Sequence, residues 1–293
     1  MNVSRRWLEA FLRRPLDAHD VSRRLAAHGA AVDAVEPVHA ALGDIVVALV
    51  EEVRPHPNAD RLRLCLVNDG GAERRHVVCG APNVTAGRKY PFAPVGSTLP
   101  GGLKLEQRKI RGELSQGMLC SARELEVGLE ADGIWELDTD AAPGTRLVDA
   151  VPLVDDRLVV DVTPNRPDLL GHKGVARELA ASFGVPYRLP AIPGTEAFDI
   201  PAIRKPAGEP SASTGGVTIT IDDRDGCARF HAAVIKGVKV GPSPLWLRQR
   251  IEAVGSRSIN NVVDATNYVM LELGQPMHAY DLATLQGPAL VAR

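Results

Sequence analysis

Between residues 45 and 137, apolar and polar positions alternate in short runs that are rich in β-branched residues. Turn sequences such as Asp69-Gly70-Gly71 and Pro100-Gly101-Gly102 separate these runs. The strands that this pattern predicts are Ile45–Val53, Leu62–Val67, His76–Cys79, Lys89–Val95 and Lys104–Ile110. Several short strands at this spacing favour a small closed or nearly closed β-barrel over a helical domain.

One barrel of this size is the oligonucleotide/oligosaccharide-binding (OB) fold, which holds single-stranded nucleic acid on one strand face and its loops. We therefore expect an OB-type barrel over residues 41–151. Charge gives this expectation no support, because the net charge of the chain is −2 and residues 44–137 carry 12 Lys or Arg against 13 Asp or Glu. Only the run Lys104, Arg108, Lys109 and Arg111 is basic, and such a run is also typical of a solvated strand face.

The segment before the barrel has helical periodicity. One short helix is predicted by four apolar residues on one face, Trp7, Leu8, Phe11 and Leu12. A second helix is expected over residues 18–28, with Val21, Leu25 and Ala26 facing inward and Gly29 as its stop. Residues 31–35 alternate and predict a strand that leads into the barrel.

The segment after the barrel has a matching pattern. Arg157–Thr163 is a predicted strand, and Lys173–Phe183 is a predicted helix with Gly184 as its stop. Since neither flank can bury much core alone, we expect residues 1–40 and 152–190 to form one small α/β unit with the barrel inserted between its halves. Three consecutive small domains are the weaker alternative. Between strand and helix, Asp161–Asp168 predicts a rigid corner in which Arg166 pairs with a carboxylate, rather than a calcium loop.

Residues 191–216 are rich in proline and glycine and predict a linker. Beyond it, residues 217–293 predict the first part of a second α/β domain that is incomplete at its C-terminal end. Its expected elements are strands Val217–Ile221 and Phe230–Ile235, a helix Pro244–Val254 capped by Ser243, a helix Val262–Leu273 between Asn260-Asn261 and Gly274, and a strand from Leu290. The predicted fold class is therefore α+β and multidomain, with an OB barrel inserted into a small α/β unit and followed by part of a second α/β domain.

The four cysteines show no CxxC pair and no zinc-like spacing. Cys65 and Cys79 lie within apolar strand runs, so we expect them to be small buried core residues, as is usual in a reducing compartment. The N-terminus lacks the apolar core of a signal peptide, and no apolar run approaches the ~18 residues of a membrane span. These features predict a cytoplasmic protein with no membrane partner.

Several stretches of the chain, taken in order, resemble one family. They are His56–Leu62, Cys79–Asn83, Arg111–Ser121, Asp161–Asp168, Gly174–Glu178, Ser258–Met270 (SINNVVDATNYVM) and Glu272–Asp281 (ELGQPMHAYD). This order resembles the N-terminal portion of the β subunit of bacterial phenylalanyl-tRNA synthetase, also called phenylalanine–tRNA ligase. The barrel motifs are the less specific part, since freestanding tRNA-binding proteins share them.

The resemblance implies an α2β2 enzyme that attaches phenylalanine to tRNA(Phe) using ATP and Mg²⁺. The aminoacylation site is implied in the α subunit, so we expect no aminoacylation residue and no metal site in this chain. The β subunit is implied to contact tRNA and to carry an editing site that hydrolyses tyrosine mischarged onto it. Editing is needed because an apolar pocket rejects an analogue with one added hydroxyl by only ~10².

Thr266, Asn267 and His278 match the editing pocket of the family. By the resemblance, Thr266 and Asn267 position the substrate, and His278 holds water or the tRNA terminus. A solvated Asn267 and an ordinary hydrogen-bonded His278 are the alternatives. The remaining pocket residues are expected after Arg293, so we predict that the fragment alone is inactive.

For tRNA binding, the candidates are Lys104, Arg108, Lys109, Arg111 and Ser115, and no DNA partner is expected. The alternative function is a freestanding, non-catalytic tRNA-binding protein that acts through the barrel. Residues 217–281 discriminate between the two hypotheses, because a pure binding module has no use for the pattern from Asn260 to Asp281.

Overall fold

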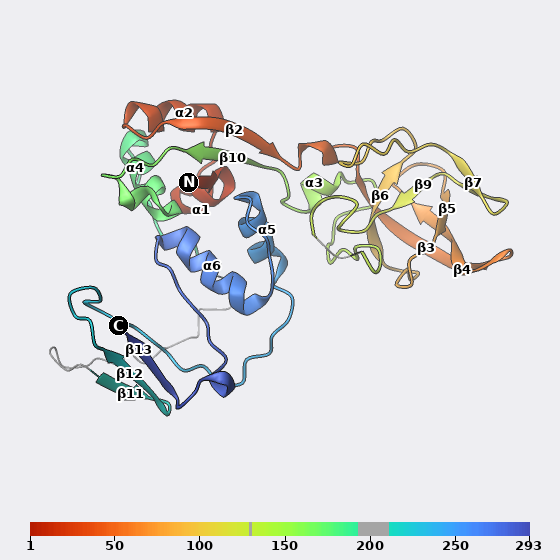
Figure 1. Ribbon diagram of the computed structural model, residues 1–293. Helices are drawn as coiled ribbons and strands as arrows, with labels where there is room; N and C mark the ends of the chain where they lie inside the picture. The colour runs from red at the N-terminus through yellow and green to blue at the C-terminus, as the bar shows by residue number, and fades with distance from the viewer. Residues whose placement is uncertain (129–130, 193–210) are drawn as a thin grey trace. The chain divides into compact units, whose positions relative to one another are not determined.

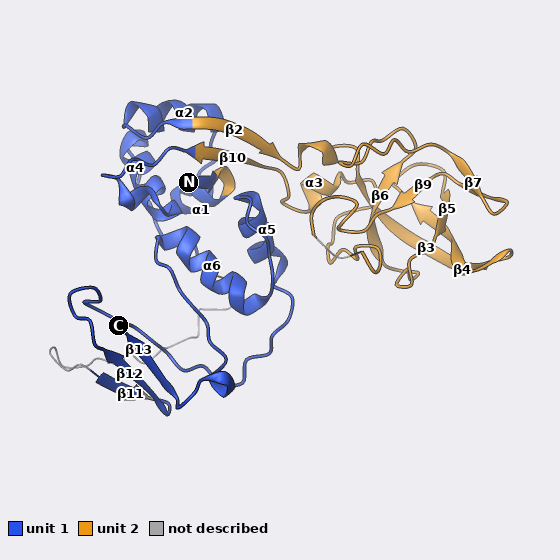
Figure 2. Ribbon diagram, in the orientation of Figure 1, with its two compact units in different colours: residues 1–3, 7–32, 160–293 blue, residues 4–6, 33–159 orange. Residues whose placement is uncertain are grey.

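The computed structural model of the chain describes residues 1–128, 131–192 and 211–293 (Figure 1). It has two compact units: residues 1–3, 7–32 and 160–293 form unit 1, and residues 4–6 and 33–159 form unit 2 (Figure 2). The main crossings lie within β2 (Val32–Val38) and at the end of β10 (Asp155–Val160). Most of unit 2 is therefore inserted within the sequence of unit 1.

Unit 2 is built on a five-stranded antiparallel sheet with the order β5-β4-β3-β6-β9. Its strands are β3 (Val46–His56), β4 (Ala59–Asn68), β5 (Arg75–Cys79), β6 (Lys89–Pro94) and β9 (Gly117–Leu119). The first four predicted strands are confirmed, and the sheet is barrel-like, consistent with an OB-type domain. The fifth prediction is only partly right, because β7 covers Arg108–Ile110 alone and pairs with β8 (Glu113–Ser115), while Lys104 forms an isolated bridge with Thr98.

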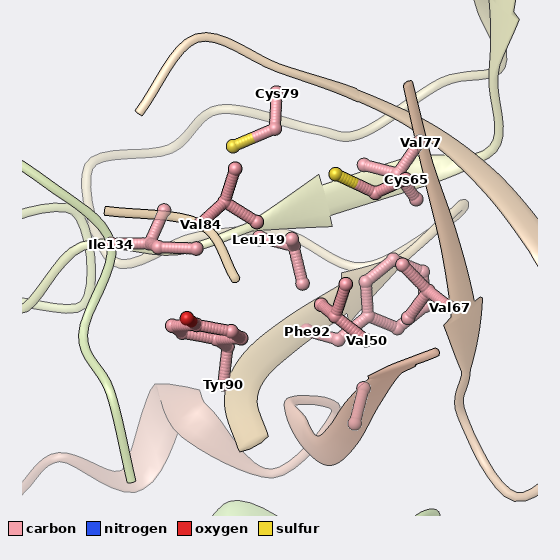
Figure 3. Packing of buried hydrophobic residues seen from close by; sticks show 11 residues of the cluster. Val50, Cys65, Val67, Val77, Cys79, Val84, Tyr90, Phe92, Leu119 and Ile134 are labelled. Atoms are coloured by element: carbon pink, nitrogen blue, oxygen red, sulfur yellow. The ribbon is translucent and has the colours of Figure 1, made fainter. Parts of the chain in front are cut away.

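Figure 3 shows the apolar core of this barrel. Tyr90 and Phe92 are fully buried, and removing side chains of this size from water stabilises the fold by ~2 kcal/mol each. Cys65 and Cys79 are 2% and 6% exposed and carry free thiols, which confirms the predicted core role. Gly117 lies so close to this core that a Cβ at its position would meet the Phe92 ring at 2.4 Å.

A three-stranded sheet has the order β1-β10-β2, with β1 at Asn2–Ser4. Helix α1 (Arg5–Leu12) buries the four apolar residues that its periodicity predicts. Helix α2 (Ala18–Ala27) buries Val21 and Leu25, but Ala26 is exposed, contrary to prediction. The reason is helix geometry, since one residue advances ~100° and turns Ala26 away from the face that Leu25 buries.

Helix α4 (His172–Phe183) confirms the predicted helix after the barrel, and it ends at Gly184, which is in the left-handed conformation. It lies in unit 1 and contacts α2. The shorter elements of the chain are η1 (Ala40–Leu42), α3 (Leu147–Ala150), η2 (Pro167–Leu169) and η3 (Leu282–Thr284).

The C-terminal part of unit 1 contains helices α5 (Leu245–Ala253) and α6 (Asn261–Leu273) and a sheet with the order β11-β12-β13. Strands β11 (Ser211–Thr214) and β12 (Val217–Ile221) are antiparallel, whereas β13 (Ala289–Ala292) runs parallel to β12. The predicted final strand is thus confirmed. Of the predicted linker 191–216, residues 193–210 lie outside the described residues, and residues 211–214 form β11 instead of a linker.

The predicted strand Phe230–Ile235 is wrong, because these described residues form no strand. Their alternation needs a partner strand to become a ladder, and Ile235 is instead 75% exposed. The predicted cap of α5 is also wrong. The Ser243 hydroxyl donates to Asp264 Oδ2 at 2.5 Å, and Pro244 occupies the N-cap position without a side-chain hydrogen bond.

The limits of α6 agree with prediction. Asn260 caps the helix, since its Oδ1 accepts from the N–H groups of Val262 and Val263 at 3.1 and 3.0 Å. The helix ends at Gly274, where φ is +76°.

Candidate functional site

The basic residues predicted for nucleic-acid contact lie on or beside the β7–β8 hairpin of unit 2. Lys104, Arg108, Lys109 and Arg111 are all exposed. Successive strand residues point to opposite faces, so Arg108 and Lys109 present positive charge on both sides of β7. The ion pair between Arg108 and Glu106 is long, at 3.9 Å, and both side chains are more than 60% exposed, so it leaves Arg108 available to an anion.

The hairpin turns over two residues, Arg111 and Gly112, whose φ angles are +52° and +99°. Two consecutive positive φ values are typical of a type I′ turn, which favours Asn and Gly. An arginine in the left-handed region costs ~1 kcal/mol, so Arg111 lies at the tip in a backbone conformation that its residue type disfavours.

Ser115 differs from the other predicted contact residues, because it is only 5% exposed. Its hydroxyl accepts from the backbone N–H of Val78 and donates to the carbonyl of Gly117, each at 3.1 Å. Contact between Ser115 and tRNA stays a prediction, but the side chain is buried in the structure. The hydroxyl instead joins β8 to β5, a role that requires a tertiary partner and that the sequence alone does not reveal.

Two residues missed by the sequence analysis support the hairpin. His56 is 5% exposed, and its Nδ1 accepts from the backbone N–H of Asn58 at 3.0 Å. The proton therefore lies on Nε2, which donates to the Ile110 carbonyl at 3.1 Å. Asn58 Nδ2 donates to the Arg111 carbonyl at 3.3 Å. The only signal in the sequence was that His56 and Asn58 lie in the stretch His56–Leu62, which contributes to the family resemblance.

The residues predicted for the editing pocket lie in unit 1. Thr266 and Asn267 are consecutive and half-buried on α6, and the Thr266 hydroxyl donates to the Val263 carbonyl at 2.7 Å. His278 follows the end of α6 and is exposed, with its ring 6.4 Å from that of Tyr280. Thr266 and Asn267 are adjacent because they are neighbours in the sequence of α6. His278 lies four residues past Gly274, and no hydrogen bond in the described chain links it to them.

A buried aromatic and polar cluster fastens α6 to α1, α4 and α5. The Trp7 ring stacks on His172 at 4.0 Å and on Tyr268 at 4.9 Å between centroids. Glu272, 5% exposed, accepts from Trp7 Nε1 at 2.9 Å and from the Tyr268 hydroxyl. Burial and this contact with Glu272 raise the pKa of Tyr268, while Arg250 donates to its hydroxyl at 2.6 Å. The helix that carries Thr266 and Asn267 is therefore rigidly placed within unit 1.

Asp264, in the first turn of α6, is fully buried and fixes the approach to the helix. Its carboxylate accepts from the hydroxyls of Ser243 and Ser258 at 2.5 Å each and from the backbone N–H of Ile259 at 2.9 Å. Three donors satisfy the buried charge. Asp264 therefore has a structural role beside the candidate residues Thr266 and Asn267.

The corner at Asp161–Asp168 is organised by Arg166, as predicted. Its guanidinium pairs with Asp168 at 3.0 Å and with Glu178 at 2.9 Å, and Arg177 also reaches Asp168 at 2.6 Å. The Arg166 hydrogen bond lowers the pKa of Asp168. In residues 1–128, 131–192 and 211–293, no group of three or more His, Cys, Asp or Glu side chains is placed to hold a metal ion. None of the helices in these ranges combines the length and the apolar character that crossing a bilayer requires.

Two family models match the chain. The putative tRNA binding domain matches residues 45–146, which coincide with the barrel of unit 2. The B3/4 domain matches residues 226–293, which include α5, α6 and β13.

Similar proteins align along the whole chain. Those from Anaeromyxobacter dehalogenans, Geobacter sulfurreducens and Syntrophus aciditrophicus are 45%, 44% and 46% identical over 100% of this chain, and each is called a phenylalanine–tRNA ligase β subunit. The chain spans 35% of the length of each of these relatives. With both domain matches in the expected order, the chain is similar over its whole length to part of the phenylalanine–tRNA ligase β subunits.

Proposed function

We propose that this chain is the N-terminal part of the β subunit of an α2β2 phenylalanine–tRNA ligase, to which it contributes tRNA binding and part of an editing site. The observation that carries the proposal is the 43–46% identity of the first five relatives over 99% or more of the chain. The match of residues 226–293 to the B3/4 domain favours it over a freestanding tRNA-binding protein, which needs no such segment.

The barrel binds tRNA through phosphate contacts in this proposal. Lys104, Arg108, Lys109 and Arg111 are exposed on or beside one hairpin, although the chain as a whole is slightly acidic. Local cations that replace the counterions of phosphates supply affinity without sequence specificity, and that affinity falls with salt. The barrel is thus an accessory that positions tRNA rather than the part that selects it.

The editing reaction is hydrolysis of the ester between tyrosine and tRNA. Such a site needs a positioned water and polarisation of the ester carbonyl, and it does not require a side-chain nucleophile. Thr266 and Asn267 hold the substrate from the rigid surface of α6, and His278 binds the attacking water or the tRNA terminus. Because the pocket needs residues beyond these three, the 293-residue chain alone does not deacylate Tyr-tRNA.

ATP and Mg²⁺ are the groups that the family uses for aminoacylation, and we do not assign either of them to this chain. Mg²⁺ is usually bound by carboxylates together with nucleotide phosphates, and no cluster of donors that could hold a metal ion is present in the ranges that the structure describes. In our proposal both groups bind in the α subunit. The free, buried thiols of Cys65, Cys79 and Cys120 fit a reducing compartment, and we place the enzyme in the cytoplasm.

The tRNA proposal is tested by binding of labelled tRNA(Phe) transcript to the 293-residue chain between 50 and 200 mM KCl. Replacing Lys104 and Arg108 together by Ala is expected to weaken binding and to reduce the slope of log K against log salt by about one per lost phosphate contact. Arg146→Ala is the matched control, because it removes an exposed cation from another part of unit 2. An unchanged slope in the double variant would contradict tRNA binding by this surface.

The editing proposal is tested in the assembled enzyme, with the complete β subunit and the α subunit. Asn267→Ala and His278→Ala are expected to slow deacylation of Tyr-tRNA(Phe) while aminoacylation with phenylalanine keeps its rate. His231→Ala, at an exposed residue of the same domain, is the control. Deacylation at the parental rate in the His278 variant would remove that residue from the site.

A further inference from the structure

The tip of the β7–β8 hairpin is attached to the turn between β3 and β4. His56 Nε2 donates to the carbonyl of Ile110, and Asn58 Nδ2 donates to the carbonyl of Arg111. Both acceptors are backbone atoms at the end of β7, so these contacts define the position of the main chain that carries Lys109 and Arg111. They leave the cationic side chains themselves exposed.

The base of the hairpin is attached separately, to β5. Gln116 and His76 exchange two hydrogen bonds, one from the Gln116 N–H to the His76 carbonyl at 2.8 Å and one from the His76 N–H to the Gln116 side chain at 3.0 Å. Ser115 adds the bond to Val78 that is described above. The hairpin is therefore fixed at both ends by different strands of the barrel.

A second attachment matters because this hairpin is weak by itself. It contains only three residue pairs, and isolated two-stranded hairpins are marginally stable in water. Its outer residues bury little surface, and its turn places Arg111 at a φ of +52°. Without the hydrogen bonds to Ile110 and Arg111, the main chain of the hairpin would be less ordered, and the positions of its cationic side chains relative to one another would no longer be fixed.

An arginine in a strained turn conformation suggests a function for the tip, since strained residues persist where the surrounding structure enforces them. Of the charged residues from 104 to 115, four are cationic, whereas Glu106 and Glu113 are anionic. A rigid, net positive hairpin suits a phosphate backbone, because less side-chain and main-chain freedom is lost on binding.

We propose that His56 and Asn58 are positioning residues that preorganise the β7–β8 hairpin to bind the phosphate backbone of RNA. This inference rests on the proposed function of the barrel. His56 acts through its Nε2–H bond to Ile110, and its Nδ1 orients Asn58 by accepting from the Asn58 N–H. Asn58 then fixes the turn at Arg111. Neither residue needs to touch RNA.

Two substitutions at His56 separate its two hydrogen bonds. In His56→Gln, the side-chain amide reaches the place of Nε2 and keeps a donor for Ile110. In His56→Asn, the shorter side chain matches Nδ1 and loses the hairpin contact. Asn58→Ala removes the second contact from an exposed residue, so the barrel core is unaffected.

The assay is binding of labelled tRNA(Phe) transcript to the 293-residue chain, measured across KCl concentration, with the thermal midpoint of each variant recorded. His56→Asn and Asn58→Ala are each expected to lower the affinity for tRNA roughly three- to tenfold, which corresponds to the loss of one hydrogen bond. Both variants are also expected to reduce the slope of log K against log salt, because the cations of the hairpin then contact fewer phosphates. His56→Gln is expected to retain most of the binding. If the role of these residues is only structural, the variants with the lowest thermal midpoints should bind tRNA most weakly. Our proposal predicts instead that the variants that lose a hydrogen bond to the hairpin bind most weakly, whatever their thermal midpoints.

The outcomes separate this inference from the proposed function. If Lys104→Ala with Arg108→Ala weakens binding but His56→Asn and Asn58→Ala bind like the parent, the positioning role is wrong and the barrel still binds tRNA. If His56→Gln loses binding as fully as His56→Asn, the bond to Ile110 is not the cause and the inference is also overturned. If neither the cation variants nor the positioning variants change binding, the proposed barrel function fails as well.

Discussion

Acid is expected to destabilise unit 1 through His172, which is fully buried at the start of α4. Its Nδ1–H donates to the Leu271 carbonyl at 2.8 Å, and its ring stacks on Trp7. Burial lowers the pKa of His172 to about 4, the bond to Leu271 opposes this shift, and the nearby Arg250 adds to it. The imidazole is therefore neutral in the fold at pH 7.

The size and sign of the effect follow from linkage. The ordinary pKa of 6.5 applies in the unfolded chain, so between pH 6.5 and 4 the unfolded state binds a proton that the folded state does not. Stability from this group is complete above pH 6.5 and is lost progressively as the pH falls towards 4. The difference between 6.5 and about 4 corresponds to ~3 kcal/mol in the free energy of unfolding.

The measurement is urea unfolding at several pH values between 7 and 4.5, followed by the fluorescence of Trp7 and Trp246 in a Trp135→Phe background. Parent, His172→Asn and His19→Asn are compared. His172→Asn keeps a donor for Leu271 but does not titrate, so its stability is expected to vary less with pH than that of the parent. His19 is exposed, and its variant is expected to follow the parent. Parallel curves for the parent and His172→Asn would refute the reasoning.

Three further predictions concern the stability of unit 1 and are read out by urea unfolding in the same background. Gly174→Ala is expected to lower the free energy of unfolding by more than ~2 kcal/mol, because the added Cβ would lie 1.7 Å from the Asp168 carbonyl oxygen, even though Ala favours a helix. Lys173→Ala, at the exposed neighbouring position, is the control and is expected to change the free energy of unfolding by no more than ~0.5 kcal/mol. Tyr268→Phe is expected to lower the free energy of unfolding by ~2 kcal/mol, since the buried Glu272 loses a hydrogen-bond donor. Tyr280→Phe, at an exposed tyrosine, is the control, and equal effects of the two substitutions would contradict the role of the buried hydroxyl. Asn260→Ala is expected to cost ~1 kcal/mol through loss of the α6 cap, and an unchanged unfolding midpoint would show that the cap contributes nothing.

The residues that guided the candidate sites could be located from the sequence, but their surroundings could not. Thr266 and Asn267 were placed correctly on a helix, because the limits of α6 depend on local rules at Asn260 and Gly274. The basic residues were expected on a strand and are exposed, but only Arg108 and Lys109 lie in a strand. The burial of Ser115 was missed, since it depends on the contact of its hydroxyl with Val78 of β5, which no local pattern specifies.

By itself, the sequence determined which segments form helices and which form strands, through the spacing of their apolar residues, and it determined most of the residues at which these elements begin and end. The alternation of the barrel strands, the apolar face of α1 and the glycine stops of α4 and α6 all follow from interactions within a few residues, which act in the same way in any fold. The resemblance of ordered motifs added the family.

Only the tertiary structure decided which distant residues meet. Trp7 donates to Glu272 across 265 positions, and His56 reaches Ile110 across 54. The Ser243 hydroxyl donates to Asp264 instead of capping α5. Residues 230–235 form no strand, although their alternating pattern predicts one. The physical reason is the same in each case. A hydrogen bond, a stack or a ladder forms only when folding brings its second partner into place, and the identity of that partner is not contained in the local sequence.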